Sequence, residues 1–468
     1  MTGSDHYENL VIGSGEGGKY LAWHLARLGQ QTAVIERKMV GGSCPNTNCL
    51  PSKNEIWSAK VADLAAYADR FGSMTGPVHT DMARVLARKT AMVDELVAIH
   101  HTLFRTSGAE LIMGTARLTG PKALSVALND DTERALTADR LFLNLGTHAA
   151  IPDIPGLRAA APLTHVEALE LGRLPEHLIV IGGGYVGLEL AQAFRRFGSA
   201  VTILDTGTRI TAREDHEVGT SLLELMESEG IQVHLSAKIN SVSGRSGEGV
   251  TVQLGLPDGI RTLSGSDLLV AAGRIPNTSG VGLEHAGIDT DARGYITVND
   301  RLETSTTGVW AIGECAGSPQ FTHASMDDFR VIRDNLAGVN RSTHGRMMPY
   351  CMFTDPPLAR VGLSEEEAVR NGLKIRVARI PTASVLRSRT ISETRGFLKA
   401  VIGEDDRILG FTMIGPEAGE VMTVVQMTMM GGMPYTALKN AVIAHPTMAE
   451  GLNVLFSSPL VSQHPPEA

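Results

Sequence analysis

A glycine-rich turn between a strand pattern and a helix pattern occurs twice in this chain. The first copy spans residues 13–18 (Gly-Ser-Gly-Glu-Gly-Gly) and the second spans residues 182–187 (Gly-Gly-Gly-Tyr-Val-Gly). In both copies an acidic residue, Glu36 or Asp205, ends the next strand pattern 23 positions after the first glycine. One such turn is weak evidence, but two copies with equal spacing predict two dinucleotide-binding βαβ units.

The residue types in both turns suit a bound dinucleotide. Glycines let the backbone approach a pyrophosphate, a helix N-terminus offers free N–H groups, and the acid accepts hydrogen bonds from ribose hydroxyls. Tight turns without a ligand are the alternative, which the repeated spacing disfavours. The residues assigned to nucleotide binding on this basis are Gly13, Gly15, Gly18 and Glu36 in the first copy, and Gly182, Gly184, Gly187 and Asp205 in the second.

Length and composition narrow the class of protein. A chain of 468 residues is long enough for roughly three domains. Its net charge of −9 argues against nucleic acid or an anionic membrane surface as a partner. No apolar run has the length of a membrane span, and the polar N-terminal segment does not resemble a secretory signal. We therefore expect a cytoplasmic protein.

Two of the four cysteines, Cys44 and Cys49, lie in one short segment. In a reducing compartment such a pair indicates redox or metal chemistry rather than a structural disulfide. Cys315 and Cys351 lack the spacing of zinc ligands, so we expect no metal site. Five positions along a regular helix would separate the two Cα atoms too far for a disulfide, which predicts irregular backbone between them.

The cysteine segment carries a specific family resemblance. Residues 41–53 (Gly-Gly-Ser-Cys-Pro-Asn-Thr-Asn-Cys-Leu-Pro-Ser-Lys) resemble the active-site signature of the class I pyridine nucleotide–disulfide oxidoreductases, such as lipoamide dehydrogenase, glutathione reductase and mercuric reductase. The resemblance extends over the chain through residues 271–278 (Ala-Ala-Gly-Arg-Ile-Pro-Asn-Thr), 310–314 (Trp-Ala-Ile-Gly-Glu) and 445–450 (His-Pro-Thr-Met-Ala-Glu).

The resemblance implies an α/β fold with two Rossmann-like domains and a C-terminal α+β dimerisation domain. Together with the Pro/Gly break at residues 152–156 and the polar break near residues 338–348, it gives expected domain bounds. The FAD-binding domain is expected to begin with residues 1–150 and to return at residues 273–345. The inserted NAD(P)-binding domain is expected to span residues 151–272, and the dimerisation domain residues 346–468.

The resemblance also implies a chemical cycle. Reduced nicotinamide gives a hydride to FAD, and the flavin reduces the Cys44–Cys49 disulfide. Cys49 is then the charge-transfer thiolate and Cys44 the interchange thiol that attacks a substrate disulfide. His445 of the partner subunit would take the proton of Cys44, oriented by Glu450. This arrangement requires a homodimer.

Further residues are assigned through the same resemblance. Lys53 and Glu189 would form an ion pair beside the flavin ring, and Tyr185 would cover the nicotinamide pocket, although it could simply be a turn residue. The remaining residues assigned to FAD are Gly42, Ser43, Gly146, Gly313 and Glu314, and those assigned to NAD are Gly273 and Arg274.

The coenzyme and the substrate are less constrained. Asp205 favours NADH over NADPH, because an acid repels a 2′-phosphate, whereas Arg209 could reach one. Tyr20, Trp23 and Trp57 near the redox segment suggest a partly apolar disulfide, although helix packing explains them equally well. We expect a small-molecule or lipoyl disulfide as substrate. The alternatives are a mercuric or other metal ion reductase, a complex-bound dihydrolipoyl dehydrogenase subunit, and a diaphorase or quinone reductase with idle cysteines.

Overall fold

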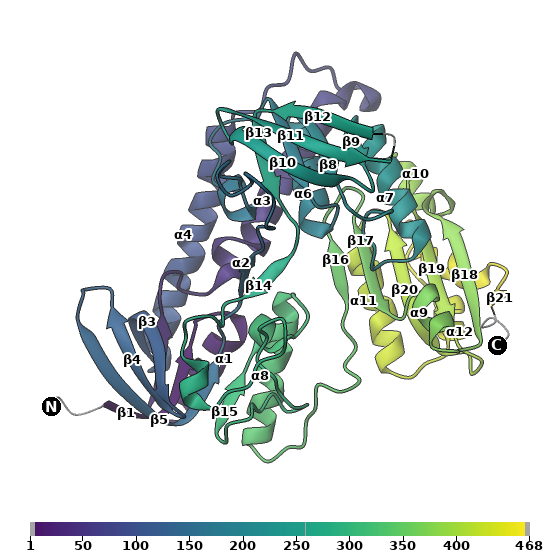
Figure 1. The fold of residues 1–468 in the computed structure, drawn as a ribbon. Coiled ribbons are helices and arrows are strands. Elements are labelled where there is room, and N and C mark those ends of the chain that lie inside the picture. Colours follow the sequence, from purple (N-terminus) through teal and green to yellow (C-terminus); the bar gives the residue numbers. More distant parts are fainter. Residues whose placement is uncertain (1–4, 258, 464–468) are drawn as a thin grey trace.

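The computed structural model of the chain describes residues 5–257 and 259–463 (Figure 1). Residues 1–4 and 464–468, which belong to the expected first and last domains, lie outside this description, as does Asp258. The chain folds around three main sheets, which differ in strand direction. Within residues 5–257 and 259–463, no helix is long and apolar enough to cross a membrane.

The first sheet contains the first glycine turn. Its parallel strands run in the order β15-β5-β1-β2-β3, and β4 pairs antiparallel with both β3 and β5. The strands are β1 (Asp5–Ile12), β2 (Thr32–Glu36), β3 (Glu110–Gly120), β4 (Ala123–Leu128), β5 (Glu133–Leu143) and β15 (Val309–Ala311). The helices of this part are α1 (Glu16–Arg27), α2 (Ser43–Asn46), α3 (Cys49–Ala66), α4 (Met82–Ser107) and α8 (Thr322–Leu336). The chain thus returns to this sheet through β15 after forming the second one.

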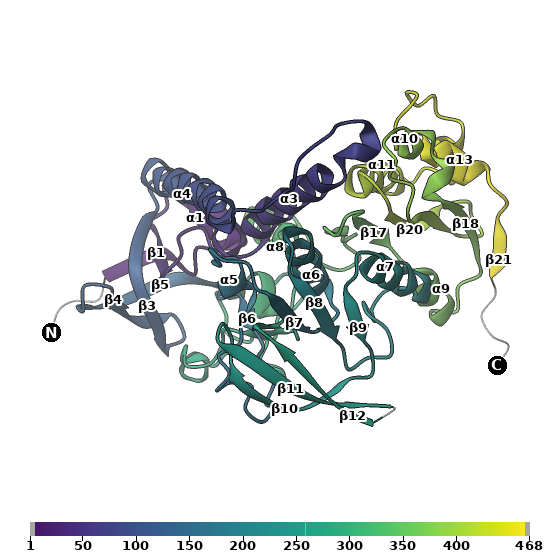
Figure 2. The same cartoon turned by 90° about the horizontal axis from the view of Figure 1, so that it is seen from above.

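The second sheet contains the repeated unit. Four parallel strands run in the order β13-β7-β8-β9, namely β13 (Asp267–Val270), β7 (His177–Ile181), β8 (Ala200–Leu204) and β9 (Gln232–His234). Its helices are α5 (His165–Ala168), α6 (Tyr185–Phe197) and α7 (His216–Ser228). An antiparallel sheet of β10 (Lys238–Arg245), β11 (Gly249–Leu256) and β12 (Gly259–Gly265) lies beside it (Figure 2). The chain enters and leaves this part through the pair β6 (Thr147–Ala149) and β14 (Arg274–Pro276). The prediction of two βαβ units is therefore confirmed.

The third sheet is antiparallel and is formed by the C-terminal part of the chain. Its order is β16-β17-β20-β19-β18-β21. The strands are β16 (Tyr350–Met352), β17 (Leu358–Gly362), β18 (Ile375–Pro381), β19 (Phe397–Ile402), β20 (Ile408–Ile414) and β21 (Val461–Gln463). The helices are α9 (Glu365–Arg370), α10 (Leu386–Thr390), α11 (Ala418–Met430), α12 (Tyr435–Lys439) and α13 (Gly451–Ser457). This α+β arrangement is the one expected for the dimerisation domain.

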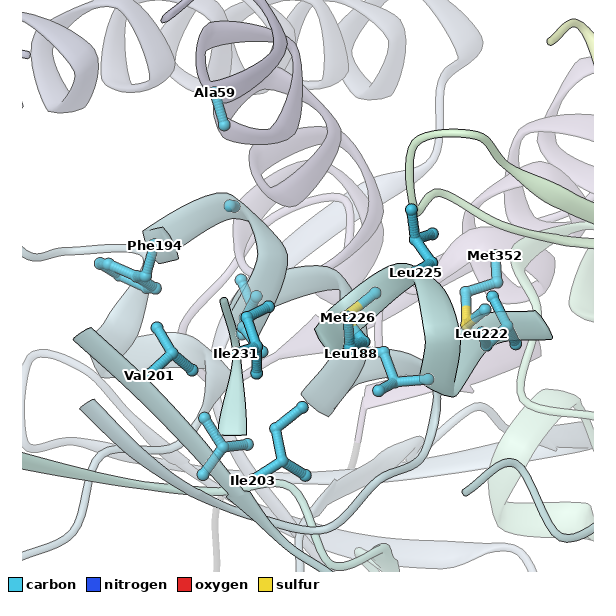
Figure 3. Packing of buried hydrophobic residues seen from close by; sticks show 14 of the residues in the cluster. Ala59, Leu188, Phe194, Val201, Ile203, Leu222, Leu225, Met226, Ile231 and Met352 are labelled. Carbon is cyan, nitrogen blue, oxygen red and sulfur yellow. The ribbon is translucent and has the colours of Figure 1, made fainter. Parts of the chain in front are cut away.

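One apolar core joins the redox helix to the other two parts of the chain. Ala59 of α3 faces α6, where Leu188 and Phe194 are buried, and Met352 of β16 belongs to the same cluster (Figure 3). Because buried side chains pack at crystal-like density, a shift of α3 relative to α6 would open voids. The core therefore fixes the position of the cysteine helix relative to the second glycine turn.

A buried ion cluster also joins the second and third sheets. The Nζ atom of Lys399 in β19 lies 2.6 Å from Asp215, 2.5 Å from Glu217 and 3.1 Å from Glu365. Lys399 is 2% exposed. Asp215 and Glu217 begin α7, whereas Glu365 begins α9. The cation thus holds carboxylates from two parts of the chain together.

We expect Lys399→Met to lower the melting temperature of the protein by several degrees. The change leaves the buried carboxylate of Asp215 without its cation, and breaking a buried ion pair costs about 3–5 kcal/mol. Scanning calorimetry measures the shift. The control is Arg407→Met, which removes an exposed pair with Asp405 and should leave the melting temperature unchanged, because exposed ion pairs contribute little. An equal shift in both variants would contradict this role.

Candidate active site

The redox segment has the irregular backbone that the cysteine spacing predicts. Cys44 lies in the short helix α2, and Cys49 is the first residue of α3. Between them, the backbone N–H groups of Thr47 and Asn48 both donate to the carbonyl of Ser43, at 2.8 and 2.9 Å. Both cysteines are free thiols, and their side chains are hydrogen-bonded to each other.

The pKa values of the two thiols are shifted in opposite directions. The hydrogen bond from Cys44 lowers the pKa of Cys49 to about 6, with help from Thr322 and the positive charge of Lys53. The same hydrogen bond raises the pKa of Cys44, as does its burial. At neutral pH the proton of the pair therefore stays on Cys44 while Cys49 is a thiolate. Cys44 needs a base before it can act as a nucleophile.

Lys53 and Glu189 are brought together as expected. Lys53 Nζ lies 2.7 Å from Glu189 Oε2, and the backbone N–H of Phe353 donates to Glu189 Oε1 at 2.7 Å. Lys53 Nζ also lies 4.8 Å from the centre of the Phe353 ring. The ion pair thus joins α3 to α6, and Phe353, which directly follows β16, supplies the hydrogen-bond donor to the second oxygen of Glu189.

The first glycine turn fits a dinucleotide such as FAD. A Cβ atom on Gly13 would lie 2.3 Å from the carbonyl oxygen of Asn144, and one on Gly42 would lie 2.5 Å from Gly15 Cα. Two backbone segments thus meet at a distance that only glycine permits. Glu36, the last residue of β2, lies beside this turn. Its Oε2 atom accepts hydrogen bonds from the N–H and the hydroxyl of Ser14 at 3.0 and 2.7 Å.

The second glycine turn leaves space for a ligand. Cβ atoms on Gly182 and Gly187 would clash with backbone oxygens at 2.5 and 2.0 Å, whereas one on Gly184 would have no atom within 4 Å. Gly184 is the N-cap of α6, and as a glycine it has no side chain that could accept a hydrogen bond from the first N–H groups of the helix. The turn therefore presents free backbone N–H groups to an open space, as pyrophosphate binding requires. Asp205 lies beside it and accepts the Gly183 N–H at 2.6 Å.

Arg274 lies closer to the residues predicted for FAD than its NAD assignment suggests. Its Nε atom donates to Thr147 Oγ1 at 2.6 Å and lies 3.3 Å from Glu314 Oε2. Gly273, which precedes Arg274, has φ +120°, and a Cβ atom built on it would have no atom within 4 Å. The carbonyl of Gly146 accepts the backbone N–H of Asn277. Gly313 donates its N–H to Asp328 at 2.7 Å. The polar side chains around β6 and β14 are thus shared between the two predicted nucleotide sites.

The C-terminal histidine is paired with glutamate as expected, but not with the thiols of its own chain. His445 Nδ1 lies 2.9 Å from both carboxylate oxygens of Glu450. The His445 side chain is 59% exposed, and the bond to Pro446 is cis. Within residues 5–257 and 259–463 it makes no hydrogen bond to Cys44.

The three aromatic residues near the redox segment differ in environment. Trp23 is buried and stacks on His100 with ring centres 5.9 Å apart, which supports the packing alternative for that residue. Trp57 is 59% exposed and Tyr20 36% exposed. Trp57 and Tyr20 are thus available on the surface, whereas Trp23 belongs to the core.

Two polar contacts at the redox segment were not predicted from the sequence. Thr322, the first residue of α8, places Oγ1 3.2 Å from Cys49 Sγ. His165 of α5 places Nε2 2.8 Å from Asn48 Oδ1, and burial lowers the pKa of His165 to about 4, so it remains neutral and donates to Asn48. No sequence signal could reveal either contact, because the partners lie more than a hundred positions apart. Among the described residues no group of three or more His, Cys, Asp or Glu side chains could hold a metal ion.

Comparison with known proteins identifies the class. Residues 7–328 match the family model described as pyridine nucleotide-disulphide oxidoreductase, and residues 348–455 match the dimerisation domain of that family. The chain belongs to the pyridine nucleotide–disulphide oxidoreductase family. It is a flavin-dependent oxidoreductase that uses FAD and NAD(P)H, and its dimerisation domain supports a homodimer.

Individual relatives match over nearly the whole chain. The chain is 34% identical over 458 residues to the probable pyridine nucleotide-disulfide oxidoreductase RclA of Escherichia coli (strain K12), covering 96% of this chain and 99% of the relative. It is 33% identical to a mercuric reductase of Streptomyces lividans (96% and 95% covered) and 30% identical to a dihydrolipoyl dehydrogenase of Bacillus subtilis (95% and 96% covered). The solved Cu(II) complex of the HOCl-induced flavoprotein disulfide reductase RclA from Escherichia coli superposes with a TM-score of 0.88 at 33% identity, covering 97% of this chain and 99% of that structure.

We expect Thr322→Val to raise the pKa of Cys49 by about one unit, because the thiolate loses a hydrogen-bond donor. The measurement is a pH titration of thiolate absorbance in the dithiol enzyme. In the wild type the thiolate should be present above pH 6 and be lost as the pH falls through about 6. Thr390→Val, at an exposed site in α10, is the control and should titrate as the wild type does. An unshifted titration in Thr322→Val would exclude this role.

Proposed function

We propose that the protein uses NADH to reduce a small-molecule or lipoyl disulfide at Cys44 and Cys49. The observation that supports this most directly is the pair of free thiols at the start of α3, with the Thr322 hydroxyl in contact with Cys49 and the Lys53–Glu189 ion pair one helical turn further along. FAD, when bound, carries two electrons from the reduced nicotinamide to the disulfide form of the pair. The first glycine turn with Glu36, and the segment with Gly42 and Ser43, would hold it.

The exchange step follows from the chemistry of the two sulfurs. After losing its proton, Cys44 attacks one sulfur of the substrate disulfide, which forms a mixed disulfide and releases one substrate thiolate. The Cys49 thiolate then attacks Cys44 Sγ, closes the Cys44–Cys49 bond and releases the second substrate thiolate. The substrate gains two electrons, and its two thiolates take up the proton from Cys44 and one from solvent.

The partner subunit supplies the base in this proposal. Glu450 accepts the hydrogen bond of His445 Nδ1, which leaves Nε2 as the free acceptor for a proton. His445 of the partner subunit takes the proton of Cys44 and later returns it to the leaving thiolate. The exposure of this side chain in a single chain agrees with a role across a subunit interface.

The proposal of NADH rather than NADPH has structural support. The Asp205 carboxylate is held at the turn by the N–H groups of Gly183 and Gly207, at 2.6 and 2.7 Å. Arg209 is engaged elsewhere, because both of its terminal nitrogens contact Glu366, at 3.2 and 3.3 Å. Asp205 would thus accept a hydrogen bond from the 2′-hydroxyl of NADH, while Arg209 is paired with Glu366 rather than free to bind a 2′-phosphate. Because NADH is an intracellular coenzyme, we also propose that the protein works in the cytoplasm.

Reduction of a metal ion is the second candidate. The solved RclA structures include Cu(II) complexes of the native protein and of its C43S mutant, and a mercuric reductase is among the relatives. Thiolate sulfur is a ligand that soft metal ions prefer. Cys44 and Cys49 would then bind the ion directly and give it electrons in place of a disulfide.

We expect Cys44→Ser to abolish NADH-dependent reduction of oxidised lipoamide while NADH still bleaches the bound flavin. His445→Ala should slow the reaction by roughly two to four decades, the range typical of general acid–base catalysis. Both are measured as NADH oxidation and stopped-flow absorbance with the FAD-loaded dimer. Cys351→Ser, which removes a thiol outside the pair, is the control and should keep wild-type turnover.

The same variants separate the alternatives. Disulfide reduction that survives in Cys44→Ser would overturn the proposal. Wild-type turnover with Cu(II) but not with lipoamide would favour the metal candidate. Quinone reduction that survives in Cys44→Ser, together with no disulfide turnover by the wild type, would indicate a diaphorase. Co-purification with a lipoyl-bearing protein would indicate a complex-bound subunit.

We expect Asp205→Ala to lower the ratio of kcat/KM for NADH over NADPH by at least about tenfold, because the variant loses a ribose acceptor and a charge that repels the 2′-phosphate. Steady-state kinetics with both coenzymes measure the ratio. Asp153→Ala, an exposed acid in the linker, should leave it unchanged. If wild type prefers NADPH, the assignment of Asp205 is wrong.

A further inference from the structure

Tyr185 faces the redox helix from the second glycine turn. It is the first residue of α6, directly after Gly184, and it lies four positions before Glu189. Cys49 and Lys53 have the same spacing on α3, so each pair shares one face of its helix. The ion pair between Lys53 and Glu189 brings these two faces together. Tyr185 would therefore stand beside a nicotinamide held between the second glycine turn and the Lys53–Glu189 pair.

A buried carboxylate anchors this tyrosine. Glu214, in the segment before α7, is 2% exposed. Its Oε1 atom accepts hydrogen bonds from the hydroxyls of Tyr185 and Tyr350, the latter at 2.7 Å, and Arg360 lies 3.2 Å from its Oε2. Burial and the charge of Glu214 raise the pKa of both tyrosines, so both remain donors. Glu214 thus gathers three partners from α6, β16 and β17.

An aromatic stack extends this anchor to the redox thiols. The rings of Tyr185 and Tyr350 have centres 5.8 Å apart, and Tyr350 stacks on Phe321 at 5.4 Å with an angle of 5° between the planes. Phe321 is the N-cap of α8, and the next residue is Thr322, which contacts Cys49. Glu214 therefore sets the position of Tyr185 relative to the segment that stabilises the thiolate.

We propose that Glu214 is a positioning residue for the coenzyme: it holds Tyr185 across the path of the nicotinamide, and NADH enters by breaking the Tyr185–Glu214 hydrogen bond. The inference rests on the proposed NADH-dependent function. Glu214 keeps Tyr350 and Arg360 when Tyr185 leaves, so the opening strands no unpaired buried charge. The lost hydrogen bond lowers the affinity for NADH, and its return favours release of the oxidised coenzyme.

The test is the affinity of oxidised, FAD-loaded enzyme for the redox-inert analogue tetrahydro-NAD, measured by calorimetry. Tyr185→Phe should bind it about ten- to a hundredfold more tightly than wild type, because no hydrogen bond to a charged group has to be broken. Tyr350→Phe should not tighten binding, because Tyr185 then keeps Glu214 without a competing donor. The thiolate absorbance of Cys49 in the dithiol enzyme should stay unchanged in Tyr185→Phe, which a general structural defect would not allow.

Two further variants complete the test. Tyr7→Phe removes a hydroxyl of β1 that donates to Glu110, the first residue of β3, and should bind the analogue as wild type does. Adding Glu214→Gln to Tyr185→Phe should give no further tightening, because Tyr185→Phe has already removed the hydrogen bond that Glu214→Gln weakens by taking away the charge of its acceptor. If Glu214→Gln does not fold, the contrast between Tyr185→Phe and Tyr350→Phe decides alone.

Three results would overturn the inference: unchanged or weaker binding by Tyr185→Phe, equal tightening by Tyr350→Phe, or additive effects of Tyr185→Phe and Glu214→Gln. Each is distinct from failure of the proposed function, in which NADH does not reduce the flavin of the wild-type enzyme at all.

Discussion

The ion pair between Lys53 and Glu189 is the contact on which the rest of the site depends. It joins the helix that begins with Cys49 to the helix that begins at the second glycine turn. The backbone N–H of Phe353 satisfies the second oxygen of Glu189, so a segment of the third sheet completes the pair. A buried carboxylate is stable only when such partners are present. These few polar atoms, together with the apolar core around Ala59, therefore hold the nucleotide turn, the thiol pair and the C-terminal sheet in one arrangement.

Local signals in the sequence were enough for much of the fold and part of the site. The two glycine turns and the cysteine segment each carry their information within a few residues, because steric demands on glycine and the chemistry of a thiol pair are local. The contact between Lys53 and Glu189 was expected through resemblance to a family, not through the residues themselves. The assigned roles of the site residues and the expected domain bounds stay predictions.

Contacts between distant segments could not be read in this way. Thr322 reaches Cys49, His165 reaches Asn48, and Glu214 gathers two tyrosines, yet none of these residues stands in a distinctive local pattern. Their roles arise from packing of elements that are far apart in sequence. Arg274 illustrates the same limit, since its motif suggested NAD while its guanidinium lies beside Glu314, which was assigned to FAD.

The uneven sharing of one proton between Cys44 and Cys49 has a protective consequence. A thiol that remains protonated reacts slowly with oxidants and electrophiles, because the thiolate is the reactive form. Cys44, the sulfur assigned to attack the substrate, holds the proton, and the thiolate of Cys49 is shielded by half-burial and its partners. In an isolated subunit Cys44 would then react slowly, and its reactivity would be reserved for the assembled enzyme with an acceptor in place.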